Sequence, residues 1–129
     1  DIRFMATYGS NAGRYIGLNF APDSVFDPAT GTLADVREFA ALAAVRLAVA
    51  PQLRVNLMGS YQNVDYAGSI PLATLSGFND KAWSAAANLF WSPVKSIDLG
   101  IEYRHGEREI VSGAKGQLDR FEFAAKYSF

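Results

Sequence analysis

The chain has 129 residues, of which half are apolar and 13% aromatic, and its 12 basic residues nearly balance 13 acidic ones to give a formal charge of -1. This composition excludes a disordered segment, which would be poor in aromatic residues and strongly charged, and it argues against a nucleic-acid-binding protein, which would show a basic excess. The lack of cysteine excludes a disulfide framework, a thiolate zinc site and a cysteine nucleophile, and the single histidine, His105, excludes a multi-histidine metal cluster. No apolar run reaches the roughly 18 residues that a membrane helix needs.

Six segments alternate between apolar and polar residues with a period of two, which predicts β-strands with one apolar and one polar face. The alanine-rich segment 36–50 could be helical on propensity alone, but Val45, Leu47 and Val49 lie two residues apart, which favours a strand. In chain order, the six segments run from Ile2 to Tyr8, from Glu38 to Val49, from Leu53 to Gln62, from Trp83 to Trp91, from Ile97 to Arg104 and from Leu118 to Phe129.

The connections between these segments alternate in length. Residues 50–52 and 92–95 form tight turns marked by proline, whereas 9–35, 65–80 and 106–117 form longer polar links. Short turns at one end of an up-and-down sheet and long loops at the other are typical of outer-membrane barrels. The partly alternating stretch Arg14–Phe20 is a candidate for a further strand.

An aromatic residue occupies the apolar-face position nearest the long loops in every predicted strand. A sparser second set, with Trp91, Tyr127 and Phe129, lies at the opposite end. Two aromatic belts that flank an aliphatic band are expected of a membrane barrel, although an aromatic-rich β-protein could show the pattern by coincidence. The predicted membrane girdle consists of Tyr8, Phe39, Tyr61, Trp83, Trp91, Tyr103, Phe121 and Phe129.

The strand count is too low for a closed barrel, since single-chain membrane barrels have at least about eight strands. An open sheet in lipid would leave unpaired backbone groups at both edges, each at a cost of several kcal/mol. Either several chains combine, or the chain is part of a larger barrel, and its start within a strand at Asp1 favours the second. We therefore predict an all-β, antiparallel, up-and-down transmembrane β-barrel, with residues 1–129 as the C-terminal part of one barrel domain.

Several motifs resemble a known family. The ending Lys126-Tyr127-Ser128-Phe129 resembles the signal read by the outer-membrane insertion machinery. The chain also resembles the end of a DcaP-like porin, a family of trimeric outer-membrane channels, most strongly after residue 88; it departs from the expected pattern near Ser10-Asn11-Ala12, where an acidic residue and further glycines are expected. The segments that carry the resemblance are Leu89–Val94, Asp98–Tyr103 and Gly106–Glu109, with Tyr8-Gly9 and Gly13–Ile16 upstream.

The resemblance implies a larger polypeptide with about sixteen strands, assembled as a homotrimer in the bacterial outer membrane. It implies passive uptake of small solutes, often dicarboxylates, and no cofactor. The implied partners are outer-membrane lipid and the insertion machinery, which would read Phe129. The resemblance also suggests that part of the longest loop folds inward to narrow the pore, with Arg14 as a contributor.

The polar face of the predicted sheet is rich in charge, and arginine dominates its basic residues. The planar guanidinium suits recognition of carboxylate or phosphate, and rows of charge along a water-filled wall set ion preference. This favours a pore wall selective for small anions; alternatively, Glu102, Arg104, Arg120 and Glu122 pair across neighbouring strands as structural ladders. The predicted pore-lining residues are Arg3, Arg46, Arg54, Glu102, Arg104 and Arg120, and the remaining charges on this face are Glu38, Asp98, Glu122 and Lys126.

Three other functions are weaker alternatives. A structural barrel could anchor a larger assembly, and a soluble lipocalin-like carrier would also be rich in strands. An outer-membrane hydrolase would need His105 as a base beside a serine such as Ser60 or Ser84, but a histidine at the start of a loop is the simpler interpretation. Asp23, Asp27 and Asp35 match no calcium-loop spacing, so no catalytic residue and no metal site is predicted.

Overall fold

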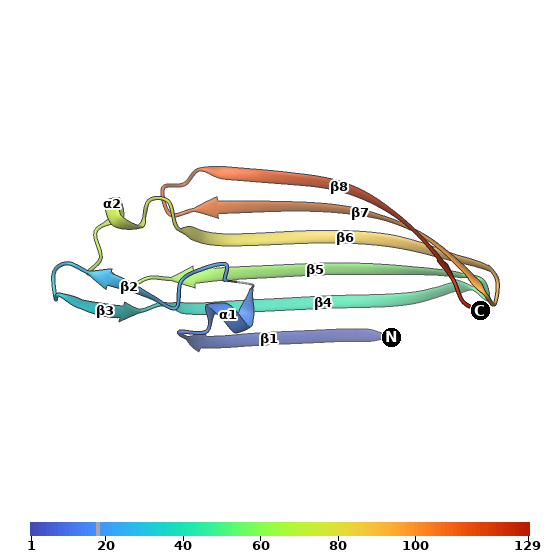
Figure 1. The fold of residues 1–129 in the computed structure, drawn as a ribbon, viewed down its shortest axis with the longest axis horizontal. Helices are drawn as coiled ribbons and strands as arrows, with labels where there is room; N and C mark the ends of the chain where they lie inside the picture. The colour runs from blue at the N-terminus through green and yellow to red at the C-terminus, as the bar shows by residue number, and fades with distance from the viewer. Residues whose placement is uncertain (18) are drawn as a thin grey trace.

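The computed structural model describes residues 1–17 and 19–129, and it places six long antiparallel strands in one sheet of order β1-β4-β5-β6-β7-β8 (Figure 1). Each long strand pairs with the next one along the chain, which confirms the predicted up-and-down architecture. The sheet is not closed, so the chain forms part of a barrel wall, with β1 and β8 at its edges. The strands are β1 (Ile2–Ser10), β4 (Arg37–Ala50), β5 (Leu53–Asp65), β6 (Asn79–Val94), β7 (Ile97–Ile110) and β8 (Lys115–Tyr127).

The alanine-rich segment is strand β4, as the two-residue spacing of its valines and leucine predicted. It pairs with β1 on one side and β5 on the other, so that Ala43 lies between Phe4 and Gly59. These pairings give the backbone of Arg37–Val45 hydrogen-bonded neighbours on both sides, and they override the helical propensity of alanine. Within the described residues, no helix is both long and apolar enough to cross a membrane.

Short turns join the strands at one end of the sheet, at residues 51–52 and 95–96, and two long connections, 11–36 and 66–78, lie at the other. The predicted third long link, 106–117, is wrong, because β7 and β8 continue to a tight turn at 111–114 in which Gly113 has a φ of 84°. Lys115 Nζ lies 3.1 Å from Glu107 Oε1 and 3.4 Å from Glu109 Oε2 across this hairpin. Polar composition here reflects cross-strand charge pairs and not a loop.

The first long connection has its own elements: the short helix α1 (Gly13–Ile16) and the hairpin of β2 (Ser24–Asp27) and β3 (Thr32–Asp35). The possible strand over Arg14–Phe20 is therefore wrong, because the stretch begins inside α1; Leu18 lies outside the described residues. Two backbone amides of α1 donate to the carbonyl of Ala12, at 2.9 and 3.1 Å, which closes a helical turn where a strand would need a partner strand. The second connection contains helix α2 (Leu72–Leu75).

The buried apolar cluster lies at the loop end and not in the wall. Here the β2–β3 hairpin, the residue before β4, the end of β5 and the connection around α2 meet, and Phe20, Tyr66 and Phe78 pack against them. Of the described residues in the middle of the wall, Ala86 alone is a buried apolar residue. The cluster consists of Ala21, Val25, Val36, Val64, Ile70 and Leu75.

Candidate functional site

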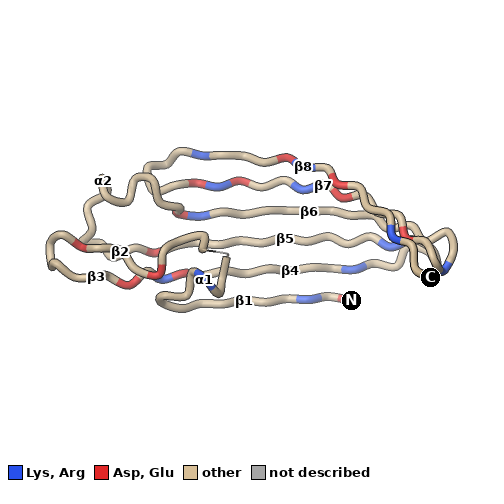
Figure 2. Tube along the Cα trace, viewed as in Figure 1, with Lys and Arg blue, Asp and Glu red and all other residues tan. Residues whose placement is uncertain are grey.

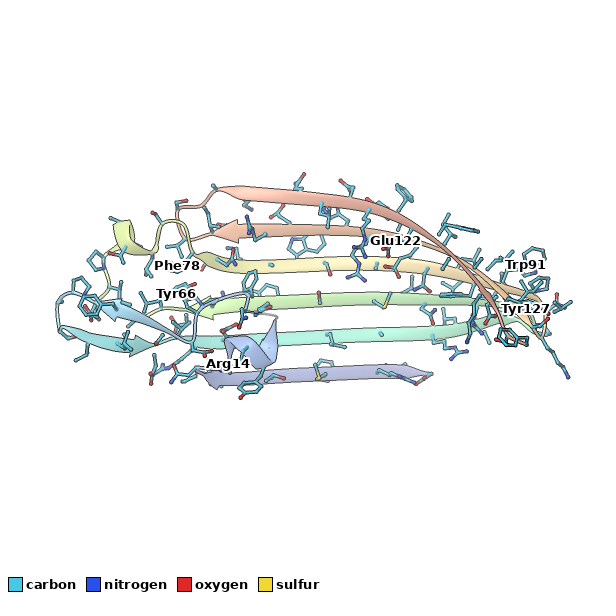
Figure 3. All side chains as sticks on the ribbon, in the orientation of Figure 1. Arg14, Tyr66, Phe78, Trp91, Glu122 and Tyr127 are labelled. Atoms are coloured by element: carbon cyan, nitrogen blue, oxygen red, sulfur yellow. The ribbon has the colours of Figure 1, made fainter. Side chains whose placement is uncertain are left out.

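The six strands keep their two faces in register across the whole sheet. On one face, Leu57 of β5 lies opposite Ala87 of β6; on the other, Asn56 lies opposite Asn88. Because side chains alternate along a strand, this register gathers the apolar positions on one side and the charged positions on the other. We call these sides the apolar face and the polar face; Figure 3 draws the side chains along the strands.

The six predicted girdle aromatics nearest the loop end form one row on the apolar face. Phe39 and Tyr61 lie with their ring centroids 6.5 Å apart, and Tyr103 and Phe121 lie 4.8 Å apart. At three of the five steps between neighbouring strands, the aromatic residues of the row pair directly with each other. From β4 to β5 the next aromatic residue lies two residues nearer the turn end than the residue that pairs with Phe39, and from β6 to β7 it lies four residues nearer than the residue that pairs with Trp83.

This offset measures the tilt of the strands. The total offset is six residues, or about 20 Å at a rise of about 3.3 Å per residue, and the five steps between strands span about 24 Å at a spacing of about 4.8 Å. The ratio of these two lengths corresponds to a strand tilt of about 40°. Strands of closed barrels tilt by about 35–45°. A row of aromatics at one membrane depth on tilted strands would show this offset, so the register supports a membrane boundary at the row.

The second aromatic set lies at the turn end of the same face. Trp91 follows Trp83 by eight residues on β6, and Phe129 follows Phe121 by eight. With the same rise and tilt, eight residues span about 20 Å along the membrane normal. The aromatic rings at both ends add to this length, so that it approaches the roughly 25 Å apolar band of such barrels.

On the loop side of the aromatic row, the same face becomes charged. Lys81 Nζ lies 3.3 Å from Glu109 Oε2. Asp119 Oδ1 lies 2.8 Å from His105 Nδ1 and accepts a hydrogen bond from the Tyr103 hydroxyl at 2.6 Å. This abrupt change from rings to ion pairs marks the end of the apolar band.

His105 itself lies inside β7 and not at the start of a loop, so its predicted position is wrong. It pairs with Ala85 of β6, and both residues lie on the apolar face. Ser84 and Ser60 lie on the polar face, with their hydroxyl oxygens 2.8 Å apart. The sheet separates the histidine from both serines, and neither can act with it as a nucleophile–base pair.

All six predicted pore-lining residues lie on the polar face, together with Glu38, Asp98, Arg108, Glu122 and Lys126. Figure 2 marks where the basic and acidic residues lie along the strands. Near the turn end, Arg54 Nη2 lies 3.3 Å from Asp98 Oδ1, and its guanidinium lies over the Phe90 ring at 5.1 Å. Asp98 also accepts a hydrogen bond from the Ser92 hydroxyl. Arg54 is thus held in place on the wall while its side chain stays one-third exposed.

An amide chain crosses the middle of the polar face. Asn56 Nδ2 donates to Asn88 Oδ1 at 2.5 Å, and Asn88 Nδ2 donates to Glu102 Oε2 at 3.0 Å. Arg46 lies opposite Asn56 at one end of this row, and Arg104 Nη2 lies 3.2 Å from Glu102 Oε1 at the other. This row of hydrogen bonds holds the Glu102 carboxylate between Asn88 and Arg104.

The four charges in the middle of β7 and β8 on the polar face do not lie opposite charges of the other sign, whereas Asp98 lies opposite Lys126 nearer the turns. Glu102 lies opposite Glu122, and Arg104 lies opposite Arg120. The ion pairs run along each strand instead, from Arg104 to Glu102 at 3.2 Å and from Arg120 to Glu122 at 2.9 Å. Like charges directly opposite destabilise a sheet, so the alternative of ladders between unlike charges on neighbouring strands does not account for these four residues.

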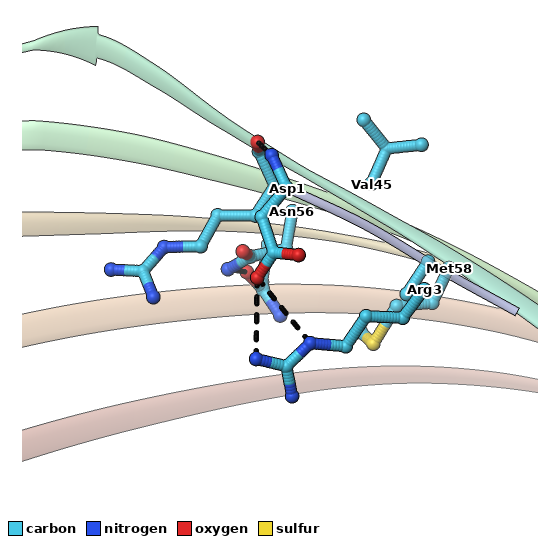
Figure 4. A pocket seen from close by; sticks show the side chains of 8 residues that line it. Asp1, Arg3, Val45, Asn56 and Met58 are labelled. Carbon is cyan, nitrogen blue, oxygen red and sulfur yellow. Dashed lines mark hydrogen bonds and ion pairs between the residues drawn. The ribbon is translucent and has the colours of Figure 1, made fainter.

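Arg3 and Arg46 border an open hollow of about 250 Å³ on the polar face (Figure 4). Asn56 and Asn88 line it as well, and Arg3 Nη2 lies 3.2 Å from Asp1 Oδ2. Two guanidinium groups and two amides around one hollow can donate several hydrogen bonds to a carboxylate.

The first long connection folds back onto the polar face, as the resemblance suggested. Gly13 and Gly17, at the two ends of α1, lie against the side chains of Glu38 and Gln62. Arg14 does not point freely into the space beside the wall, because its Nη2 and Nε lie 2.8 and 3.1 Å from Asp23 Oδ2. Sequence reasoning placed Glu38 on this face but missed its burial, for which no local signal exists.

The loop acids serve separate local contacts. Asp23 holds Arg14, Asp35 accepts a hydrogen bond from Asn11 Nδ2 at 3.0 Å, and Asp27 accepts one from the Ser69 hydroxyl at 2.6 Å. In residues 1–17 and 19–129, no three histidine, aspartate or glutamate side chains are grouped as they would be to hold a metal ion.

Comparison with known proteins gives a family. The family model described as DcaP outer membrane protein matches residues 51–129. The crystal structure of the outer membrane channel DcaP of Acinetobacter baumannii superposes with a TM-score of 0.69 and 30% sequence identity, over 77% of this chain and 28% of that one. No curated protein matches the chain at a significant level. The chain thus spans about a quarter of the length of that channel, and it is an outer-membrane β-barrel segment that belongs to the DcaP outer membrane protein family.

Proposed function

We propose that the full-length protein is a channel for passive diffusion of small hydrophilic solutes across the outer membrane, with a preference for small anions such as dicarboxylates. The observation that carries the proposal is the excess of basic side chains on the polar face, opposite the apolar face that suits lipid. A wall with an excess of positive charge raises the local concentration of anions. The basic residues are Arg3, Arg46, Arg54, Arg104, Arg108, Arg120 and Lys126, against Asp1, Glu38, Asp98, Glu102 and Glu122.

Their arrangement also supports selectivity for carboxylates. Arg104 and Arg120 lie opposite each other on β7 and β8, and Arg3 and Arg46 share one hollow. Paired guanidinium groups can engage the two ends of a dicarboxylate in succession, because each offers a planar fork of donors. The neighbouring carboxylates keep these contacts weak enough for a solute to leave.

The test uses the ion selectivity of the full-length channel in a planar bilayer with a salt gradient. Replacing Arg54 and Arg104 by glutamine should shift the reversal potential toward cation preference, because both charges lie on the polar face. Arg37→Gln is the matched control, since Arg37 lies opposite Ser10 and Asp65 on the other face, beyond the aromatic row. An unchanged reversal potential in the double variant contradicts the assignment of these arginines as pore-lining.

The same recordings test the alternative that the barrel is a structural anchor. The ion pairs along β7 and β8 are the observation that favours it, since they satisfy charges without any solute. Folded, membrane-inserted protein without single-channel conductance would support the anchor and contradict the channel.

We also propose the assembly partners. A homotrimer and contact with outer-membrane lipid agree with the exposed apolar face. Phe129, fully exposed beyond β8, would be read by the insertion machinery. Removal of Phe129 should lower the yield of inserted protein, measured in outer-membrane fractions, whereas Ser128→Ala should leave it unchanged.

A further inference from the structure

Glu38 is the most deeply buried charged residue described, with only 1% of its surface exposed. Its Oε2 accepts a hydrogen bond from Gln62 Nε2 at 2.8 Å. Its Oε1 is buried and has no hydrogen-bond partner in the part of the chain that the structure describes. A buried carboxylate oxygen without a partner is costly when the group is ionised.

Helix α1 is what covers Glu38, and two glycines allow the close approach. A Cβ added at Gly13 would lie 2.7 Å from Glu38 Oε1 and 2.3 Å from the carbonyl oxygen of Ala21. A Cβ added at Gly17 would lie 2.4 Å from Gln62 Oε1. The backbone of α1 therefore rests directly on two polar side chains of the wall, and any larger residue would lift it.

The charged and titratable groups around Glu38 do not neutralise it. From the loop side, Asp23 brings a second carboxylate, which accepts hydrogen bonds from the Gly13 amide at 3.1 Å and from Arg14 at 2.8 and 3.1 Å. Arg14, the cation next to Gly13 on α1, is thus engaged by Asp23.

From the second long connection, Tyr66 packs against the buried apolar cluster at the loop end, and its hydroxyl donates to the carbonyl of Asn79 at 2.6 Å. Burial raises the pKa of Tyr66 to about 12, and the negative charges of Glu38 and Asp80 add to the effect. Tyr66 therefore stays neutral and leaves the charge of an ionised Glu38 uncompensated. A proton on Oε1 is the simplest way to remove the buried charge of Glu38.

We propose that Glu38 is a proton-operated latch that holds α1 against the polar face of the wall. Protonated Glu38 lets α1 dock, whereas ionised Glu38 favours its release, because release returns the carboxylate to water. The proposal rests on the proposed channel function, since the position of α1 affects transport only if the polar face lines the pore. In that case Tyr15, which is exposed on docked α1, narrows the passage.

The direction of the pH response follows from proton linkage. The docked state binds one proton more than the released state, so acidification favours docking. For a single proton, the ratio of docked to released states changes by at most about tenfold per pH unit. Open-channel conductance should therefore fall as the pH is lowered.

The experiment is single-channel recording of the full-length protein in planar bilayers between pH 8 and pH 4.5. The natural protein should show a lower conductance level that becomes dominant at acid pH. Glu38→Gln, which stays neutral, should remain in the lower level at every pH. Glu122→Gln is the matched control, because it removes the same charge from a half-exposed position of the polar face and should keep the pH response.

A second variant acts in the opposite direction. Gly13→Ala places a methyl group against Ala21 and Glu38 and should hold the channel in the higher level at all pH values. A pH response in Glu38→Gln equal to that of the natural protein would overturn the latch.

A readout that does not need conduction separates failure of the latch from failure of the channel. Spin labels at Tyr15→Cys on α1 and Ala44→Cys on β4 report their separation in the membrane-inserted protein. The distance distribution should broaden and lengthen from pH 4.5 to pH 8, and the change should vanish with Glu38→Gln. An unchanged distribution would overturn the latch even in a conducting channel, whereas the predicted change in a non-conducting protein would contradict only the proposed function.

Discussion

At the loop end of the molecule, six apolar residues are buried against one another, whereas in the wall the large apolar side chains of β4 to β7 remain exposed on the apolar face. Leu57 and Ile101, in the middle of the wall, expose about half of their surface, but Val36 and Ile70 at the loop end expose 1% and 4%. One part of the chain buries its apolar groups in itself, and the other leaves them for lipid.

This difference shows where each region obtains its stability. The loop end has a small core of its own, so its order depends on packing within this chain. The wall depends on hydrogen bonds between strands and on transfer of the apolar face into lipid, because an open sheet has no second layer to cover it. Substitutions should therefore act by different rules in the two regions.

The largest expected effect comes from a charge on the apolar face. Leu57→Arg should destabilise the folded barrel by about 2–4 kcal/mol, the cost of arginine at the membrane midplane. Met58→Arg, one residue along on the polar face, should be nearly neutral, since its side chain would meet water. Urea unfolding of the full-length protein in lipid vesicles measures both, and equal losses would contradict the assignment of faces.

Next in size is a cavity in the loop-end cluster. Ile70→Ala should destabilise the local structure by about 2 kcal/mol, at the lower end for buried isoleucine because the cluster is small. Leu72→Ala is the control, since Leu72 is mostly exposed. Limited proteolysis of the connection 66–78 measures the local opening, and global unfolding of the barrel should change little. Equal cleavage rates in the two variants would disprove the local core.

A smaller effect is expected in the aromatic row. Tyr103 and Phe121 face each other on β7 and β8 with their rings 4.8 Å apart. A double-mutant cycle with alanine should give a coupling energy of about 0.5–1.5 kcal/mol. The pair Tyr103 and Phe129 should show none, because the two residues lie at opposite ends of the apolar band.

The smallest effect is a pH dependence of the β2–β3 hairpin. The Ser69 hydroxyl and the Ala29 amide donate to the Asp27 carboxylate and lower its pKa. A carboxylate with a lowered pKa stabilises the folded hairpin above its unfolded pKa of about 4, and this contribution is lost as the pH falls through the lowered value.

Protease protection of the hairpin should therefore decrease below about pH 4. Asp27→Asn should weaken the hairpin at neutral pH and remove the dependence, and Asp35→Asn, at the end of β3, serves as the control. A hairpin that is equally protected at pH 3 and pH 7 would contradict the role of Asp27.

The two regions also differ in how far the sequence predicts them. In the wall, strand faces and the aromatic row follow from a period of two, which is a local property that pairing must respect. At the loop end, the β2–β3 hairpin is itself local, because Asp27 lies opposite Thr32 and Gly31 in its turn has a φ of 70°, so a turn signal existed there. The burial of Glu38 depends instead on Gln62 and on residues of the first long connection, which lie far from it in the chain. A single sequence carries no signal for such contacts.

Composition also misled the prediction of the β7–β8 connection. Gly106 and Gly116 suggested a loop but lie within the strands, where cross-strand pairs of Lys115 with Glu107 and Glu109 maintain the hairpin. The arrangement of Arg104 opposite Arg120 required the register, which only the structure supplies.

The central claim, that the polar face lines water and the apolar face meets lipid, can be tested most directly by cysteine accessibility along β4. The chain has no cysteine of its own, and alanines occupy both faces of this strand, so each substitution is mild. In outer-membrane vesicles of the full-length protein, a water-soluble maleimide should label Ala40→Cys and Ala44→Cys and should not label Ala41→Cys or Ala43→Cys. Labelling that fails to alternate, or that alternates with the opposite phase, would contradict the account.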